Sequence, residues 1–108
     1  MWVERPIEKA THEQLVSKLG NGEGEQRFGL YTTARKHLIE EILPQIRAVL
    51  PNLTDHSPEH VAHVLDNAGY LLNIEAEPAK LSPIELYSLI LSILFHDVGN
   101  IRPRRPSA

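Results

Sequence analysis

The sequence predicts an all-α fold, a small helical bundle, and three observations support this prediction. Apolar residues recur at steps of three and four over two long segments, which is the spacing of one face of a helix. Two Ser-Pro pairs, each followed closely by Glu, precede apolar runs and are typical of helix N-termini. No segment shows a convincing strand pattern of alternating apolar and polar residues.

The composition is that of a single globular domain. The chain has 108 residues, of which 42% are hydrophobic and 23% are charged, and both fractions are ordinary for a soluble protein. The sequence contains no cysteine, which excludes a disulfide framework, a thiolate zinc site and a cysteine nucleophile.

The charge distribution argues against nucleic acid as a partner. The net charge is −3, yet three of the eleven basic residues lie at Arg102, Arg104 and Arg105, so that the rest of the chain is distinctly acidic. Nucleic-acid binding depends on many Lys and Arg side chains that neutralise phosphates, and three arginines are too few. The sequence also lacks a signal peptide and an apolar run of the ~20 residues that span a bilayer. We therefore expect a cytoplasmic protein without a membrane partner.

Residues 1–27 are predicted to form a short N-terminal helix followed by a glycine-rich linker. The tetrapeptide Thr11–Gln14 has the form of a capping box, so the helix is expected to start there and to stop at Gly20. Residues 20–26 contain three glycines and are predicted to be a mobile connection.

Residues 28–101 are predicted to form the bundle itself. The segment 30–50 is one helix that Pro44 should kink or restart. A second helix should begin after Ser57 as N-cap, with one stripe of apolar residues: Val61, Val64, Leu65, Ala68, Leu71 and Leu72. A third helix should begin with the capping box of Ser82 and Glu85 and, being apolar nearly all round, should be central and buried. Residues 102–108 are interpreted as an Arg/Pro tail.

The pair His96-Asp97 at the end of the last apolar run is the sharpest indication of chemistry. An imidazole and a carboxylate beside a core are costly unless they are paired or bind a metal. Neutral imidazole and carboxylate oxygen are both suitable ligands for a divalent cation. A hydrogen-bonded helix terminus would explain the dipeptide equally well, so the pair by itself leaves both interpretations open.

A second group of histidines surrounds the start of the helix after Ser57. His60 lies in the first helical turn at the margin of the apolar stripe, where it can be a metal ligand or a half-buried histidine bonded to a backbone carbonyl. His63 points away from the stripe and is expected to be solvated. His56 precedes the cap and is interpreted as a loop residue or as a residue that supports metal ligands without binding the metal itself.

His60-Val-Ala-His-Val64, followed by an apolar helix that ends in Leu94-Phe95-His96-Asp97-Val98-Gly99, resembles the HD superfamily of metal-dependent phosphohydrolases. The resemblance implies that His60, His96 and Asp97 bind a divalent metal (Mn, Mg, Fe, Ni or Zn) and that Asp97 also acts in catalysis. It further implies hydrolysis of a nucleotide or another phosphoester by metal-activated water. The opening Asp55-His56-Ser57-Pro58-Glu59-His60 and the ending Gly99-Asn100-Ile101 resemble HD modules at the front of larger bacterial proteins, some of which carry an Hsp90-type ATPase.

The sequence departs from the HD pattern after the His-Asp pair. In that family a further Asp follows on a later helix, whereas the only aspartates here are Asp55, Asp66 and Asp97. Asp66 is expected to be solvated, and Asp55 could reach the site only by an unusual path. The chain is therefore interpreted as an HD-like bundle truncated on its C-terminal side, with reduced or no activity. The alternative is a non-catalytic helical assembly or regulatory module. The uncovered apolar surface predicts a homo-oligomer or a partner domain.

Overall fold

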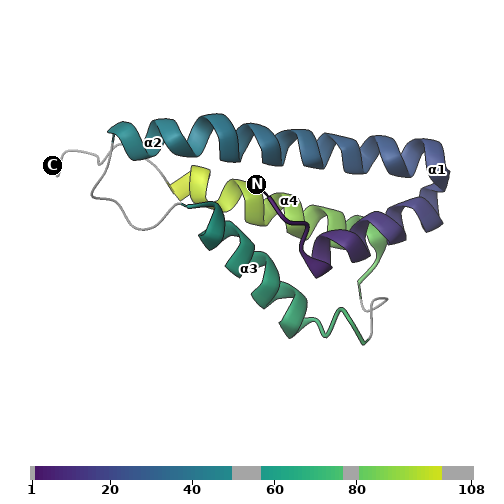
Figure 1. The fold of residues 1–108 in the computed structure, drawn as a ribbon. Helices are drawn as coiled ribbons and strands as arrows, with labels where there is room; N and C mark the ends of the chain where they lie inside the picture. The colour runs from purple at the N-terminus through teal and green to yellow at the C-terminus, as the bar shows by residue number, and fades with distance from the viewer. Residues whose placement is uncertain (1, 50–56, 77–80, 101–108) are drawn as a thin grey trace, which may run out of the picture.

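The computed structural model describes residues 2–49, 57–76 and 81–100, without the side chains at 47, 49 and 97–100. It contains α1 (Pro6–His37), the π-helix η1 (Leu38–Ile42), α2 (Leu43–Val49), α3 (Pro58–Leu71) and α4 (Pro83–Asn100). These ranges contain no strand. Figure 1 shows α4 between the long arm of α1 with α2 and the obliquely placed α3. The prediction of an all-α small helical bundle is confirmed.

Helix α1 begins five residues before the predicted capping box, so the predicted start at Thr11 is wrong. Arg5 is the N-cap with extended backbone, and Pro6 occupies the first helical position, where the missing N–H costs nothing. The carboxylate of Glu8 accepts the Arg5 backbone N–H at 2.8 Å. Thr11 lies inside the helix, where its hydroxyl donates to the Ile7 carbonyl at 2.7 Å. That bond four residues back satisfies the hydroxyl without a cap.

The glycine-rich segment 20–26 was predicted to be a linker, and this prediction is wrong beyond its first residue. Gly20 has φ 87° and ψ 166°, a conformation that glycine adopts without strain, and it breaks the helical path. Residues 21–26 are helical again, and α1 folds back on itself at Gly20 as a helical hairpin (Figure 1).

Close contacts hold the two arms of this hairpin together. A Cβ placed on Gly24 would lie only 2.6 Å from the Cα atom of Val16, so the backbones touch at this glycine. The ring of His12 stacks on Phe28 with centroids 4.2 Å apart, and its Nε2 atom lies 2.9 Å from Oε1 of Glu25. The N-terminal helix is therefore packed on the rest of α1. The boundaries predicted at 27 and 101 remain predictions.

Pro44 was predicted to kink the helix or to restart it nearby, and the structure has a wider helical turn immediately before this proline. In η1 the backbone N–H of Leu43 donates to the Leu38 carbonyl, five residues back. Pro44 has no N–H to donate, and its ring would clash with the carbonyl four residues earlier in a regular helix. The wide turn avoids both difficulties, and α2 then continues from Leu43.

The core joins residues of every helix around α4. One stripe of α4 is fully buried, but its two ends carry exposed apolar side chains, with Ile84 46% and Phe95 48% exposed. The prediction that this helix is central (Figure 1) and buried is therefore confirmed for one stripe and wrong for the face that carries Ile84 and Phe95. On α3 the predicted stripe is buried at Val61 and Leu65, whereas Leu71 is 80% exposed. The core consists of Ile7, Leu15, Phe28, Tyr31, Leu38, Leu43, Val61, Leu65, Ile90 and Leu94.

Candidate metal centre

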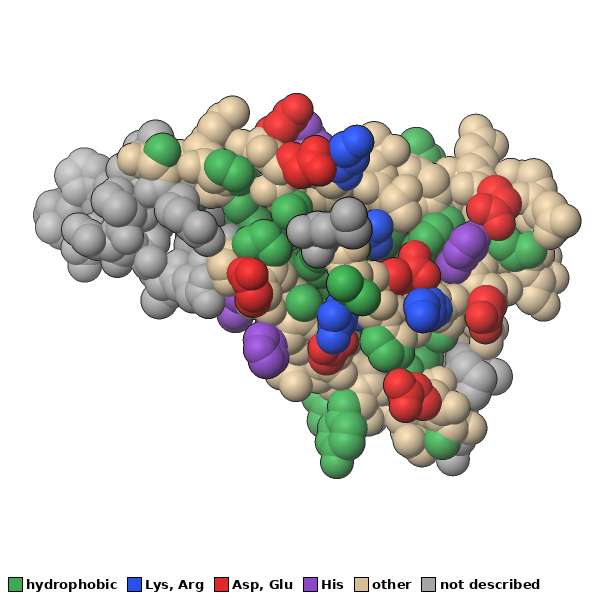
Figure 2. All heavy atoms as spheres, in the orientation of Figure 1, with side chains coloured by type: hydrophobic (Ala, Val, Ile, Leu, Met, Phe, Trp, Pro, Cys, Tyr) green, Lys and Arg blue, Asp and Glu red, His purple; other side chains and the backbone are tan. Residues whose placement is uncertain are grey.

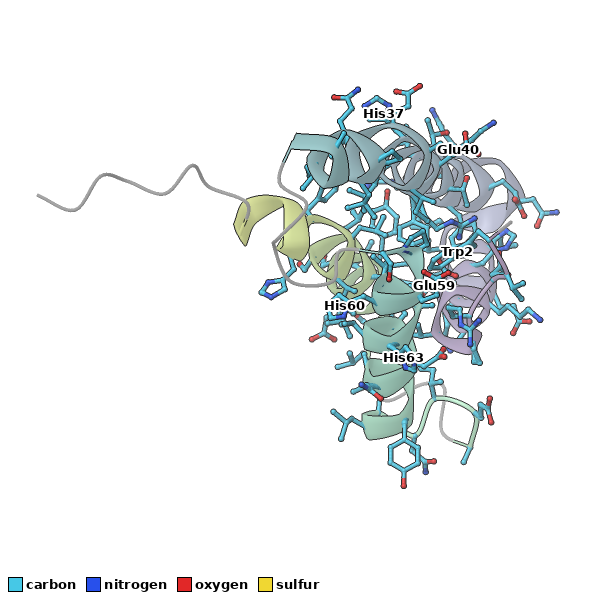
Figure 3. The ribbon with its side chains drawn as sticks, turned by 60° about the vertical axis from the view of Figure 1, so that its left-hand side comes forward. Trp2, His37, Glu40, Glu59, His60 and His63 are labelled. Atoms are coloured by element: carbon cyan, nitrogen blue, oxygen red, sulfur yellow. The ribbon has the colours of Figure 1, made fainter. Side chains whose placement is uncertain are left out.

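The fold brings the two predicted parts of the metal site to neighbouring elements. His60 lies in the first turn of α3, and His96 lies in the last turns of α4. Figures 1 and 3 both place the first turn of α3 beside the C-terminal half of α4, and the two helices are in contact. Segments separated by more than thirty residues in the sequence thus meet at one end of the bundle.

The position of His60 follows from local capping by Ser57. As predicted, Ser57 is the N-cap of α3, and its hydroxyl accepts the backbone N–H of His60 at 3.2 Å. His60 is half-buried, whereas His63, one turn further on, is exposed as expected for a solvated side chain (Figure 3). His56 lies outside the described residues.

Helix α4 is fixed at its start by the predicted capping box, and His96 and Asp97 follow near its end. The Ser82 backbone N–H donates to Glu85 Oε1 at 2.9 Å, and the Glu85 backbone N–H donates to the Ser82 hydroxyl at 3.1 Å. The backbone and hydroxyl hydrogen bonds with Ser82 lower the pKa of the Glu85 carboxyl. At the other end His96 is exposed, and the side chain of Asp97 is outside the description.

The donor types at this end of the bundle fit a divalent cation. Two imidazoles and one carboxylate are suitable ligands for zinc, manganese or nickel. Within the side chains that the structure describes, no three His, Asp or Glu residues are close enough together to hold a metal. Because Asp97 is not among those side chains, the predicted set of His60, His96 and Asp97 stays a prediction.

A buried carboxylate that the sequence analysis did not identify lies at the start of α1. Glu8 is fully buried and accepts four hydrogen bonds. Its Oε1 atom accepts from the Trp2 indole N–H at 3.0 Å and from the Arg5 backbone N–H at 2.8 Å. Its Oε2 atom accepts from the Tyr31 hydroxyl and from the Arg35 guanidinium at 2.7 Å. The local signal was Pro6 at the first helical position with Glu8 two residues later.

Arg35 and Tyr31 complete the surroundings of this carboxylate. The Arg35 guanidinium carbon lies 5.3 Å from the centroid of the Trp2 ring and 5.6 Å from that of Tyr31, within the range of cation–π attraction. Burial raises the pKa of the Tyr31 phenol far above its ordinary value, and the negative charge of Glu8 raises it further. The phenol is therefore a neutral donor to Glu8.

Asp66 was predicted to be solvated, and this prediction is only partly correct, because its side chain is 37% exposed but its carboxylate is bound by Arg5. Its Oδ1 atom accepts from Nε of Arg5 at 2.8 Å, and its Oδ2 atom accepts from a terminal nitrogen of Arg5 at 2.6 Å. The Asp66 carboxylate raises the pKa of the Arg5 guanidinium. Two parallel bonds of this kind are geometrically specific, and they commit Asp66 to Arg5 rather than to a metal site.

A cavity of about 660 Å³ lies between the N-terminal segment, the second arm of α1 and the start of α3. Its walls include Trp2 and Glu59, both labelled in Figure 3, and the cations Arg5, Arg35 and Lys36. His60 is not part of its lining, so this cavity is distinct from the predicted metal site.

Comparisons with known proteins identify a family for this chain. No curated protein and no solved structure matched the chain. Within the described residues, no helix has both the length and the apolar character needed to cross a membrane. The model of the HD-CE family matches residues 50–108, a stretch that contains His60, His96 and Asp97. Because this match covers more than half of the sequence, the chain belongs to the HD-CE family and contains an HD-type domain.

Proposed function

We propose that the chain is a metal-dependent phosphohydrolase domain of the HD type. The observation that carries the proposal is the HD-CE match, which spans both parts of the predicted ligand set. The contact between α3 and α4, the helices that hold His60 and His96, supports it. The proposed substrate is a nucleotide or another small phosphoester.

Each of the three residues has a distinct part in this proposal. His60 and His96 present imidazole nitrogens to a divalent metal, and Asp97 presents a carboxylate that also orients the attacking water. When bound, the metal lowers the pKa of water and stabilises charge on a phosphoryl oxygen. The cap at Ser57 supports His60, because it fixes the backbone of the first turn of α3.

The carboxylates of this sequence limit the expected activity. Asp66 is engaged by Arg5 through both oxygens, and Asp55 lies outside the described residues. We therefore expect Asp97 to be the main carboxylate of the site and hydrolysis by this chain to be slow. The metal can be Mn, Mg, Fe, Ni or Zn, and the experiment below compares them.

Metal binding and phosphoester hydrolysis test the proposal together. Each metal ion is titrated into the protein by calorimetry, and nucleotides and a general phosphoester are then assayed with the ion that binds. In His60→Ala, His96→Ala and Asp97→Ala proteins we expect metal affinity to fall at least about tenfold and hydrolysis to disappear.

His63→Ala is the matched control, because His63 lies on the same helix but is exposed. It should bind metal and hydrolyse substrate like the unsubstituted protein. Metal binding that survives all three alanine substitutions, or that is lost equally in His63→Ala, would contradict the proposed ligand set.

A second function, a non-catalytic assembly or regulatory module, is favoured by exposed apolar side chains. Tyr70 and Leu71 are 85% and 80% exposed at the C-terminal end of α3, where Figure 2 shows an apolar projection. Such residues commonly mark contacts with another chain. Sedimentation velocity of the protein and of a Tyr70→Ser/Leu71→Ser variant tests this: a self-associating protein that becomes monomeric in the variant supports it. A monomer with rapid metal-dependent turnover would contradict it.

A further inference from the structure

We propose that the N-terminal hairpin, defined here as residues 2–37, holds α3 in position and thereby positions His60. This segment lies outside the stretch that matches the HD-CE family. The inference rests on the proposed function only where it concerns metal binding, since the placement of α3 can be measured separately. In this proposal Arg5 and Asp66 are positioning residues that do not touch the metal.

The first step is the bond between Arg5 and Asp66. It joins residues that are 61 positions apart, and its two hydrogen bonds of 2.8 and 2.6 Å restrict both distance and orientation. Asp66 follows His60 by six residues on the same helix, a separation of about 9 Å along the axis. Because a helix of this length is stiff, a constraint at Asp66 also constrains the first turn of α3.

The second step is the support behind Arg5. Its backbone N–H donates to Glu8, and the Glu8 carboxylate is fully buried. Glu8 is bound in turn by Tyr31 and Arg35, which come from the second arm of the hairpin. A continuous set of hydrogen bonds therefore runs from α3 through Arg5 and Glu8 to the longest helical arm.

The third step is close packing at the same contact. A Cβ placed on Gly69 of α3 would lie 3.4 Å from Cβ of Ile7 and 3.3 Å from Cγ2 of Ile74, so the start of α1 lies directly against α3. Leu65, one turn earlier, is fully buried in the core that contains Ile7. Packing sets the separation of the two helices, and the Arg5–Asp66 bonds restrict rotation and sliding of α3.

Distances between spin labels test the placement of α3 without any metal. The chain has no cysteine, so His63→Cys on α3 and Ser92→Cys on α4 provide two unique labelling positions, both exposed. In this background we expect Asp66→Ala to shift and broaden the distance distribution between the labels. Asp66→Glu, which keeps a carboxylate, should restore most of the original distribution.

Glu41→Gln is the matched control, because it removes an exposed carboxylate that pairs at 2.5 Å with His37, only four residues earlier. It should leave the label distances unchanged. Circular dichroism shows whether each variant is folded. If Asp66→Ala unfolds, Arg5→Lys takes its place, because lysine keeps the positive charge but cannot form the paired hydrogen bonds. Unchanged distances in a folded Asp66→Ala or Arg5→Lys protein would overturn the inference.

Metal affinity of the unlabelled proteins gives the second readout. We expect Asp66→Ala to weaken binding of the ion that the unsubstituted protein prefers, by less than the roughly tenfold loss that follows substitution of a residue bonded directly to a metal ligand. Asp66→Glu should recover the affinity. If the unsubstituted protein binds no metal, the proposed function fails, and the label distances still decide whether the hairpin positions α3. Equal metal affinity in all variants, with shifted label distances, would contradict the link to His60.

Discussion

Replacing Glu8 by Gln should destabilise the protein strongly while changing its shape very little. The substitution keeps the length of the side chain and one acceptor oxygen but removes the negative charge. The new NH2 group of the amide would replace the other oxygen and would face two of the four donors that now surround the carboxylate. Those donors would lose their acceptor, and Arg35 would lose its anionic partner.

The structure sets the expected size of this effect. Removing one partner of a buried ion pair costs about 3–5 kcal/mol, because the other charge remains without compensation. Glu8 is fully buried, whereas the Arg35 side chain is 14% exposed and retains part of its hydration. The loss of unfolding free energy in Glu8→Gln should therefore lie near the lower end of this range, at about 3 kcal/mol. This is a large part of the 5–15 kcal/mol that is typical of a domain.

Urea unfolding measures this loss. Far-ultraviolet circular dichroism reports the helices, and fluorescence of Trp2, the single tryptophan of the chain, reports the surroundings of Glu8 directly. Glu41→Gln, at an exposed pair, should change stability by less than about 0.5 kcal/mol. If Glu8→Gln is equally harmless, within about 1 kcal/mol of the unsubstituted protein, the reasoning about a buried and compensated charge is refuted.

Two further predictions concern the same hairpin. Gly24→Ala should destabilise the protein by about 1–3 kcal/mol in urea unfolding, because its Cβ would meet the Val16 backbone at 2.6 Å. Gly22→Ala, with open space around it, should stabilise by about 0.5–1 kcal/mol, and the reverse order would exclude the close approach of the two arms. The raised pKa of Tyr31 means that the unfolded chain releases this proton near pH 10 while the folded chain keeps it. The stabilisation from the protonated Tyr31 phenol is therefore complete below about pH 10. Above that pH, the free energy of unfolding should fall by about 1.4 kcal/mol per pH unit. Tyr31→Phe should show a shallower fall in urea midpoint against pH, and an equally steep fall would contradict this assignment.

Local rules account for what could be predicted from the sequence. The caps at Ser57 and Ser82 and the irregular helical turn before Pro44 depend on hydrogen bonds among residues three to five apart. All three features lie where the pattern indicated a start or a disturbance of a helix. The prediction that His60 lies in the first turn of a helix was correct for the same reason.

The predictions that were wrong have both local causes and causes that lie in packing between more distant residues. Thr11 looked like a cap, but the helix had already begun at Pro6. Residues 20–26 looked like a linker, yet contacts such as that between Gly24 and Val16 pack the segment as helix against the first arm.

The sequence by itself determined the all-α class, the caps of α3 and α4 and the presence of a His-Asp pair after an apolar run, because each depends on neighbours within a turn or two. Only the tertiary structure decided that Glu8 is a buried anion with four donors and that Asp66 binds Arg5. It also decided that α3 and α4 bring His60 and His96 to one end of the bundle. Burial and pairing of charge depend on which distant segments meet, and no local pattern of residues specifies that meeting.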